Sequence, residues 1–146
     1  MQLQEMKALT DEQVKEIAEQ LDCGFRCFWS KQANEFLFVP DTNRFPGMDT
    51  EAFDEELEKL DNNFDNYEEI EAMQSSDSFE MMAEFSEQLT DNASLQRQLI
   101  FALNNKKPFS GFKNVIDNSG AYRAEWFRFK NEKLKEWVRK KMSELS

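Results

Sequence analysis

Histidine is absent from the 146 residues of this chain. Its absence excludes Ser–His and Cys–His nucleophilic catalysis, most general acid–base sites and the commonest zinc ligand. Cysteine is nearly absent, since Cys23 and Cys27 are the only two. A structural zinc site needs four thiolate or imidazole ligands, so two thiols cannot form one. We predict that both cysteines are small buried residues and that the chain has no catalytic or metal-ligating residue.

Glycine and proline are also scarce, with four and three residues. The glycines stand singly at positions 24, 47, 111 and 120, so the chain has neither the dinucleotide-binding nor the P-loop pattern of clustered glycines. No phosphate-bearing cofactor is therefore expected, and we predict no cofactor at all. A hydrolase that uses only carboxylates stays open, but 29 acidic residues give no reason to select a pair.

Long apolar runs are missing as well. No stretch approaches the roughly 18 apolar residues that a membrane-spanning helix needs. The first residues, Met1 to Glu5, lack the basic and apolar regions of a secretory signal, and two cysteines do not make a disulfide framework. These features predict a cytoplasmic protein without a membrane segment.

Acidic residues, in contrast, are abundant. The chain has 29 Asp and Glu against 18 Lys and Arg, which gives a net charge of -11. From Lys106 to the C-terminus there are 11 basic and 5 acidic residues, so the part before it has 7 basic and 24 acidic residues. The charge is therefore polarised along the sequence, and the sequence leaves open whether it is polarised in space.

Hydrophobic residues are sufficient for one core, at 40% of the chain with 14 phenylalanines. The length is typical of one domain, and no linker or repeat interrupts it. We predict a single α+β domain over residues 1–146, with residues 1–8 as a segment that could be disordered. Its elements are an N-terminal helix, a small antiparallel sheet and about four C-terminal helices.

The N-terminal elements have clear local signals. Thr10 and Gln13 form a capping-box pattern before the apolar stripe of a helix that Gly24 ends. Two strand-like runs follow, residues 25–29 and 35–39, with a polar loop between them that predicts a hairpin. Residues 67–73 are ambiguous between a third strand and a loop.

The segment from Asp49 to Glu71 has 11 acidic residues against a single lysine. It begins with a predicted helix whose apolar edge contains Leu57 and Leu60. Its later part resembles a calcium loop at four ligand positions, but Asn66 replaces the glycine of the tight turn and Ala72 replaces the bidentate glutamate. We interpret it as an acidic solvated segment.

The C-terminal part is predicted to be helical. Asp77 with Glu80 indicates a helix cap, and a second stripe runs from Leu95 to Leu103. Pro108 suits the first turn of a short helix, which Phe109 and Phe112 are expected to anchor in the core. In the last helix, the predicted apolar face comprises Phe127, Leu134, Val138 and Leu145, with Trp126 and Trp137 beside it.

These C-terminal residues carry a resemblance to a known family. The runs Phe79–Phe85, Lys106–Ile116 and Trp126–Phe129, with Leu103 and Trp137, resemble uncharacterised protein family 0158. Its pattern includes a short strand, an F-x-x-F-K segment and a W-[YF]-x-[FY] helix, which favours a strand at residues 67–70. The chain departs from it at Lys106-Lys107-Pro108, where the family pattern has Gly-Arg. The resemblance implies the fold and its extent but no activity, because the family has none established.

Two functional hypotheses remain. The first is a non-enzymatic protein-binding or accessory module whose acidic face attracts a basic partner, because complementary charge raises association rate and specificity. A solvated face that only maintains solubility is the plainer alternative. The residues of the candidate acidic face are Glu51, Asp54, Glu55, Glu58, Asp61 and Asp65.

The second hypothesis is contact with an anion or a nucleic acid through the basic C-terminal part. Its candidate residues are Lys106, Lys107, Lys113, Arg128, Lys135 and Arg139. Against it, acidic residues such as Glu132 and Glu136 alternate with these cations at helical spacing, which is typical of a solvated helix face. We therefore expect a protein partner, and the sequence leaves its identity and the oligomeric state open.

Overall fold

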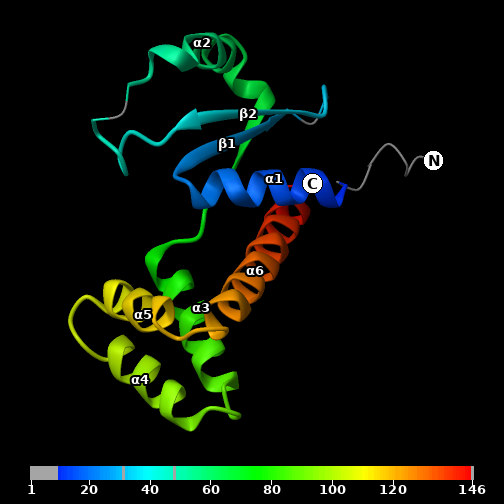
Figure 1. Cartoon of the computed structure of the whole chain (residues 1–146). Helices are drawn as coiled ribbons and strands as arrows, with labels where there is room; N and C mark the ends of the chain where they lie inside the picture. The colour runs from blue at the N-terminus through cyan, green and yellow to red at the C-terminus, as the bar shows by residue number, and fades with distance from the viewer. Residues whose placement is uncertain (1–9, 31, 48, 146) are drawn as a thin grey trace. The chain divides into compact units, whose positions relative to one another are not determined.

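The structure is a computed structural model that describes residues 10–30, 32–47 and 49–145. The prediction for residues 1–8 lies outside this part of the chain. Helices and one three-stranded antiparallel sheet make up the described residues, which confirms the α+β class (Figure 1). The chain folds as two compact units: unit 1 comprises residues 1–72 and 135–146, and unit 2 comprises residues 73–134. The single domain over residues 1–146 stays a prediction.

The first helix, α1 (Asp11–Asp22), begins as the sequence predicts. Thr10 Oγ1 accepts a hydrogen bond from the Gln13 backbone N–H at 3.1 Å, and Gln13 Oε1 accepts one from the Thr10 backbone N–H at 3.1 Å. The helix ends at Asp22, and Gly24 follows the C-cap Cys23 with a φ of +99°, a conformation that side-chain-bearing residues rarely adopt. The buried residues of α1 are Val14, Ile17, Ala18 and Leu21.

The Thr10→Ala variant is expected to lose about 1 kcal/mol of unfolding free energy, because the Gln13 backbone N–H loses its side-chain acceptor. Urea unfolding followed by circular dichroism measures this loss. Thr50→Ala is the matched control, since Thr50 precedes the short helix η2 (Glu51–Phe53) without a side-chain cap bond. Equal losses in the two variants would contradict a capping role for Thr10.

The sheet has the order β2-β1-β3, so β1 is its central strand. Strand β1 (Phe25–Ser30) pairs with β2 (Glu35–Pro40) in the predicted hairpin and with β3 (Tyr67–Ile70) on its other edge, both antiparallel. Residues 67–70 of the ambiguous segment are thus a strand, whereas residues 71–73 are not. Phe28 lies opposite Leu37 and Glu69, and Cys27 lies opposite Phe38 and Ile70.

Successive residues of a strand face opposite sides of the sheet, so Phe28 and Cys27 belong to different faces. The Phe28 face packs with Leu37, Val39 and Leu60, and Leu60 comes from α2 (Asp54–Asn62). Figure 1 shows α1 and α2 on opposite sides of the sheet. The C-terminal part of α6 (Tyr122–Leu145) adds the buried residues Val138 and Met142 to unit 1.

Unit 2 consists of α3 (Ser75–Gln88), α4 (Ala93–Leu103), α5 (Pro108–Asp117) and the first part of α6. Its core is one cluster of side chains from these four helices. The buried members are Met81, Met82, Phe85, Leu89, Leu95, Leu99, Leu103, Phe112, Ile116 and Trp126. Phe85 and Phe112 contact the Trp126 ring edge-on, with centroids 5.2 and 4.9 Å away.

Three local predictions in this unit are wrong. Helix α3 begins earlier than expected, with Gln74 as N-cap and Asp77 as the third helical residue that binds back to it. Phe109 is 40% exposed, because it lies in the first turn of α5 and only Phe112 and Ile116 point into the core. The buried stripe of α6 contains Trp126 in place of Phe127, which is exposed.

Candidate functional site

The predicted acidic face is formed by three consecutive elements of unit 1. Glu51 lies in η2, Asp65 lies in η3 (Phe64–Asn66), and the other four residues lie in α2. All six are exposed. In α2 the spacing of Asp54, Glu58 and Asp61 places them on one side of the helix, away from the buried Leu60.

An exposed aromatic residue adjoins these carboxylates. Phe64 is 64% exposed, and it lies between Asp61 and Asp65 in the sequence directly after α2. We call the six carboxylates together with Phe64 the acidic surface. The aromatic ring gives this surface an apolar contact that a merely solvating surface does not need.

The acidic surface forms no direct ion pair within the described part of the chain, although the pKa of Lys59 is raised by its hydrogen bond to Glu35 and, to a smaller extent, by the charge of Glu55. None of the ion pairs between described residues uses any of its six carboxylates. Lys59, the one cation of α2, instead binds Glu35 of β2, which also accepts a hydrogen bond from the Tyr67 hydroxyl at 3.0 Å. Lys59 and then Tyr67 lower the pKa of Glu35 by hydrogen bonding to its charged form.

Other carboxylates of unit 1 do have cationic partners. Glu69 forms a two-pronged pair with Arg26 across neighbouring strands, at 2.8 and 2.9 Å, and Asp11 pairs with Arg139. These carboxylates are neutralised, so the negative charge of unit 1 that has no cationic partner lies on other residues, among them those of the acidic surface.

The structure divides the six predicted basic residues between the two units. Lys106, Lys107, Lys113 and Arg128 belong to unit 2, and Lys135 and Arg139 belong to unit 1. Two of them are already neutralised: Arg139 pairs with Asp11, and Lys113 pairs with Asp117 at 2.8 Å. Lys113 and then Arg123 lower the pKa of Asp117 through hydrogen bonds. Lys135 is also in contact with a partner group.

Lys106 and Lys107 lie in the turn between α4 and α5, next to apolar side chains whose exposure was not predicted. Phe101 is 71% exposed, and Ile100 and Phe109 are 39% and 40% exposed. Lys107 has a left-handed backbone, with φ 55°, and directly precedes Pro108 at the start of α5. This turn places the end of α4 beside the first turn of α5. The two helices are so close at Gly111 that a Cβ atom added there would lie 3.3 Å from the Cβ atom of Ala102.

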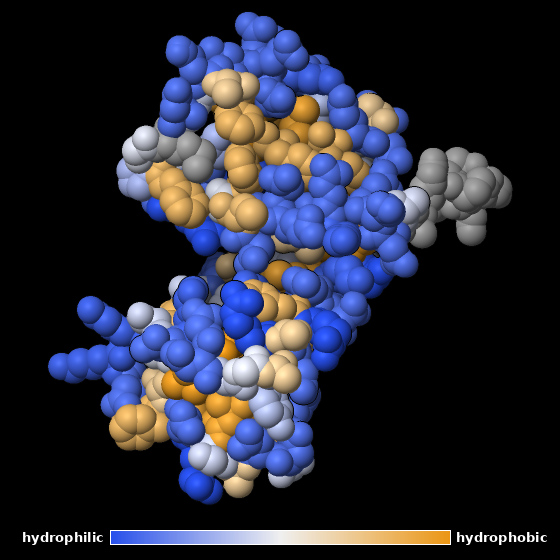
Figure 2. Space-filling model, in the orientation of Figure 1, coloured by the Kyte–Doolittle hydropathy of each residue, from blue (hydrophilic) through white to orange (hydrophobic). Residues whose placement is uncertain are grey.

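A signal for this surface was present in the sequence. Arg97, Ile100, Phe101 and Asn104 follow the i, i+3, i+4, i+7 spacing of one helix face, and the buried Leu95, Leu99 and Leu103 occupy another. We name the group Arg97, Ile100, Phe101, Lys106, Lys107 and Phe109 the α4–α5 tip. Figure 2 shows hydrophobic side chains reaching the surface over these two helices.

The two units also differ in charge. Residues 73–134 contain eight basic and eight acidic residues, so unit 2 is neutral and the net charge of -11 belongs to unit 1. The division of charge between the two units therefore differs from the division along the sequence. The basic end of α6 belongs to the acidic unit 1, and Lys106 belongs to the neutral unit 2.

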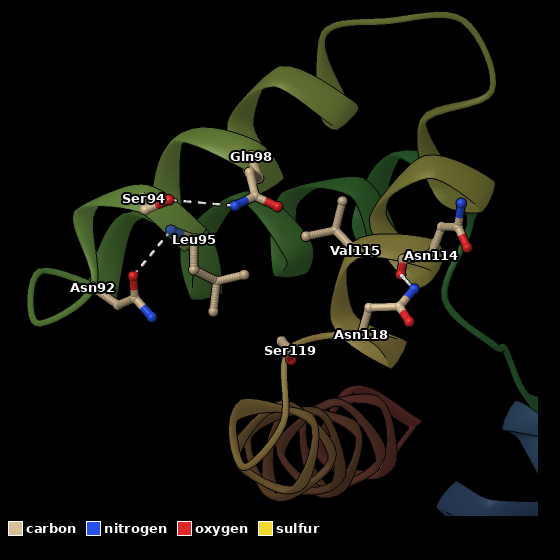
Figure 3. Close-up of a pocket in the computed structure, with 8 residues that line it drawn as sticks. All are labelled: Asn92, Ser94, Leu95, Gln98, Asn114, Val115, Asn118 and Ser119. Carbon is tan, nitrogen blue, oxygen red and sulfur yellow. Dashed lines mark hydrogen bonds between the residues drawn. The ribbon is translucent and has the colours of Figure 1, made fainter.

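A shallow hollow of about 410 Å³ lies between α4 and α5 (Figure 3). It is lined by Asn92, Ser94, Leu95, Gln98, Asn114, Val115, Asn118 and Ser119. None of these side chains titrates near neutral pH, so they supply no general acid or base. Several also serve the helices: Asn92 caps α4, and Asn118 Nδ2 donates to the Asn114 carbonyl at 2.8 Å.

The predicted burial of both cysteines is half right. Cys27, in the central strand, is fully buried, but Cys23 is exposed because it is the C-cap of α1. Both thiols are free. Within the described residues, no three His, Cys, Asp or Glu side chains are grouped so as to hold a metal ion.

Among the helices that the structure describes, none has both the length and the apolar character that crossing a bilayer requires. Neither curated proteins nor solved structures include a match to the chain. Residues 8–144 match the model of an uncharacterised protein family, which covers nearly the whole sequence and confirms the resemblance seen in its motifs. The chain belongs to the Uncharacterised protein family (UPF0158).

Proposed function

We propose that the chain is a non-enzymatic protein-binding module and that its acidic surface binds a basic segment of a partner protein. The observation that carries this proposal is the exposed Phe64 beside six exposed carboxylates that form no direct ion pair with a described residue. An aromatic anchor with charged neighbours is a common arrangement at protein interfaces, where the ring supplies affinity and the charges supply rate and specificity.

The charges themselves favour a bound state. Asp54 and Glu58 are four residues apart on α2, and like charges at this spacing destabilise a helix by roughly 0.2–0.5 kcal/mol. Lysines or arginines of a partner would remove this repulsion on binding. Glu35, Glu69 and Asp11 obtain the same relief from cations of their own chain.

We further propose that the protein acts in the cytoplasm, which the two free thiols support. The alternative of nucleic-acid contact lacks an observation that favours it. Its candidate cations lie in different units, and both Lys113 and Arg139 are engaged with carboxylates of the chain itself.

Photo-crosslinking in the native host tests the protein-binding proposal. The full chain with p-benzoylphenylalanine in place of Phe64 is expected to form one predominant adduct on irradiation. Glu55→Lys with Glu58→Lys is expected to reduce its yield by about tenfold or more, because the partner then meets like charge. The yield is read from gels, and the adduct is identified by mass spectrometry.

Two controls make the result specific. Glu12→Lys with Glu19→Lys changes the net charge equally at exposed positions of α1 and is expected to leave the adduct unchanged. The crosslinker at the exposed Lys15 of α1 should give no adduct of that mass. If reversal on α2 has no more effect than reversal on α1, the acidic surface is not a binding site.

A further inference from the structure

The α4–α5 tip is an exposed apolar patch with unneutralised cations. Phe101 is the most exposed large apolar side chain of the described residues, at 71%. None of the ion pairs between described residues involves Arg97, Lys106 or Lys107. Burial of the exposed rings against a partner would be favourable, because it removes apolar surface from water. The three cations require that the partner surface be acidic.

The acidic surface has the complementary composition. Phe64, at 64%, is the second most exposed large apolar side chain of the described residues. Each of the two most exposed rings thus lies in a charged surface, and the two surfaces have opposite sign. The tip needs carboxylates next to an accessible apolar group, and the sequence from Asp61 to Asp65 supplies both.

We infer that the α4–α5 tip binds the acidic surface of a second copy of this chain. Lys106 and Arg97 meet the carboxylates of the neighbouring α2, and Phe101 packs against the neighbouring Phe64. This inference rests on the proposed function, because it names the partner of the acidic surface. The contact joins two different surfaces, so each copy in a pair retains one free surface of each kind, and further copies can add.

Other occupants fit the tip less well. An anionic membrane or a nucleic acid would satisfy the three cations, but the chain as a whole has a net charge of -11, which repels an extended polyanion. A second copy presents Asp54, Glu58 and Asp61 from one side of α2 and leaves the rest of its charge in solvent. Since the attraction is local and opposed by the net charge, we expect weak association that depends strongly on salt.

Analytical ultracentrifugation of the full chain measures this association directly. At about 0.05 M salt the weight-average mass is expected to rise above 17.3 kDa as the protein concentration increases. At about 1 M salt, where the Debye length is roughly 3 Å, it is expected to return towards 17.3 kDa. A mass that stays at the monomer value in low salt at every concentration overturns the inference.

Reciprocal charge reversal identifies the two surfaces. The tip variant combines Arg97→Glu and Lys106→Glu, which leaves the left-handed Lys107 unchanged. The acidic-surface variant combines Glu55→Lys and Glu58→Lys. Each alone is expected to weaken self-association by about tenfold or more, because like charges then face each other. An equimolar mixture is expected to associate again, because each variant then presents the opposite charge to the other.

The Glu12→Lys/Glu19→Lys variant is the matched control and should associate as the unchanged protein does. Circular dichroism confirms that each variant is folded, which the exposure of every substituted residue favours. A mixture that stays monomeric overturns the inference, as does weakening by the tip variant without weakening by the acidic-surface variant.

The crosslinking experiment keeps this outcome apart from that of the proposed function. If the protein is monomeric, its position-64 adduct contains a different protein and the α2 reversal abolishes that adduct, then the proposed function stands and self-association is rejected. An adduct of two copies supports both. If α2 reversal changes neither measurement, both are rejected.

Discussion

Iodoacetamide at pH 8 is expected to modify Cys23 of the native protein about a hundred times faster than Cys27, or more. The reagent reacts with the thiolate, so both access and ionisation control the rate. Cys23 is exposed, whereas Cys27 is completely buried in the central strand of the sheet. Burial, and to a smaller extent the charges of Glu69 and Glu16, raise the pKa of Cys27 to about 12.

The slow reaction of Cys27 follows from this pKa. At pH 8 a thiol with a pKa near 12 is ionised to about one part in ten thousand, so almost none of Cys27 is in the reactive form. Because pH 8 lies well below the raised pKa, the thiolate fraction of Cys27 still grows tenfold with each pH unit. Hindered access to the buried sulfur can only enlarge the difference.

Mass spectrometry after timed quenching measures both rates in one sample. Cys23→Ser and Cys27→Ser variants assign each rate to its thiol, and the protein unfolded in guanidinium chloride should be labelled at both sites at similar rates. Comparable native rates would contradict the placement of Cys27 in the core and, with it, the register of β1 against β2 and β3.

Local signals in the sequence are sufficient for most elements of this fold. The capping box at Thr10, the stop at Gly24 and the two runs of the hairpin each depend on neighbouring residues, and all are confirmed. The third strand needed the family resemblance, because residues 67–70 have a mixed pattern. Their pairing with β1 is a contact over some forty positions, which local propensity does not encode.

Exposure was harder to predict than helix positions. Trp126 and Phe127 are adjacent, so they point about 100° apart on α6, and the sequence does not show which ring meets Phe85 and Phe112. For the same reason Phe109 was predicted to be a core residue, although its side chain is 40% exposed. Both of these exposed rings lie in unit 2.

The candidate surfaces illustrate this contrast. The six carboxylates of the acidic surface could be selected from composition and spacing, and the structure places them together on η2, α2 and η3. The α4–α5 tip was not selected, although Ile100 and Phe101 follow a helix face of their own, because the spacing of apolar residues does not show which of two apolar faces stays exposed. An excess of apolar residues around α4 leaves Phe101 with no core position to fill, since Leu95, Leu99, Ala102 and Leu103 already occupy the buried side.

Substitution of Trp126 by alanine is expected to remove about 3–5 kcal/mol from the stability of unit 2. The side chain is 7% exposed and lies among rings from three helices. Phe85 of α3 and Phe112 of α5 contact it edge-on, and Phe129 lies 6.2 Å away on the next turn of α6. Its removal leaves a cavity that these side chains can fill only in part, and it ends two favourable edge-to-face contacts.

Native-state hydrogen exchange measures the loss where it occurs, because the free energy of opening is obtained for each protected amide. The amides around Leu99 in α4 and Ile116 in α5 are suitable, since both residues are buried in the unit 2 core.

Phe127→Ala is the matched control, one position further along α6. Phe127 is 36% exposed and contacts Arg123 and Lys130 through its ring face, so its removal is expected to cost below about 1 kcal/mol. Equal losses in the two variants would mean that Trp126 is not the centre of this core and that the orientation of α6 in unit 2 is wrong.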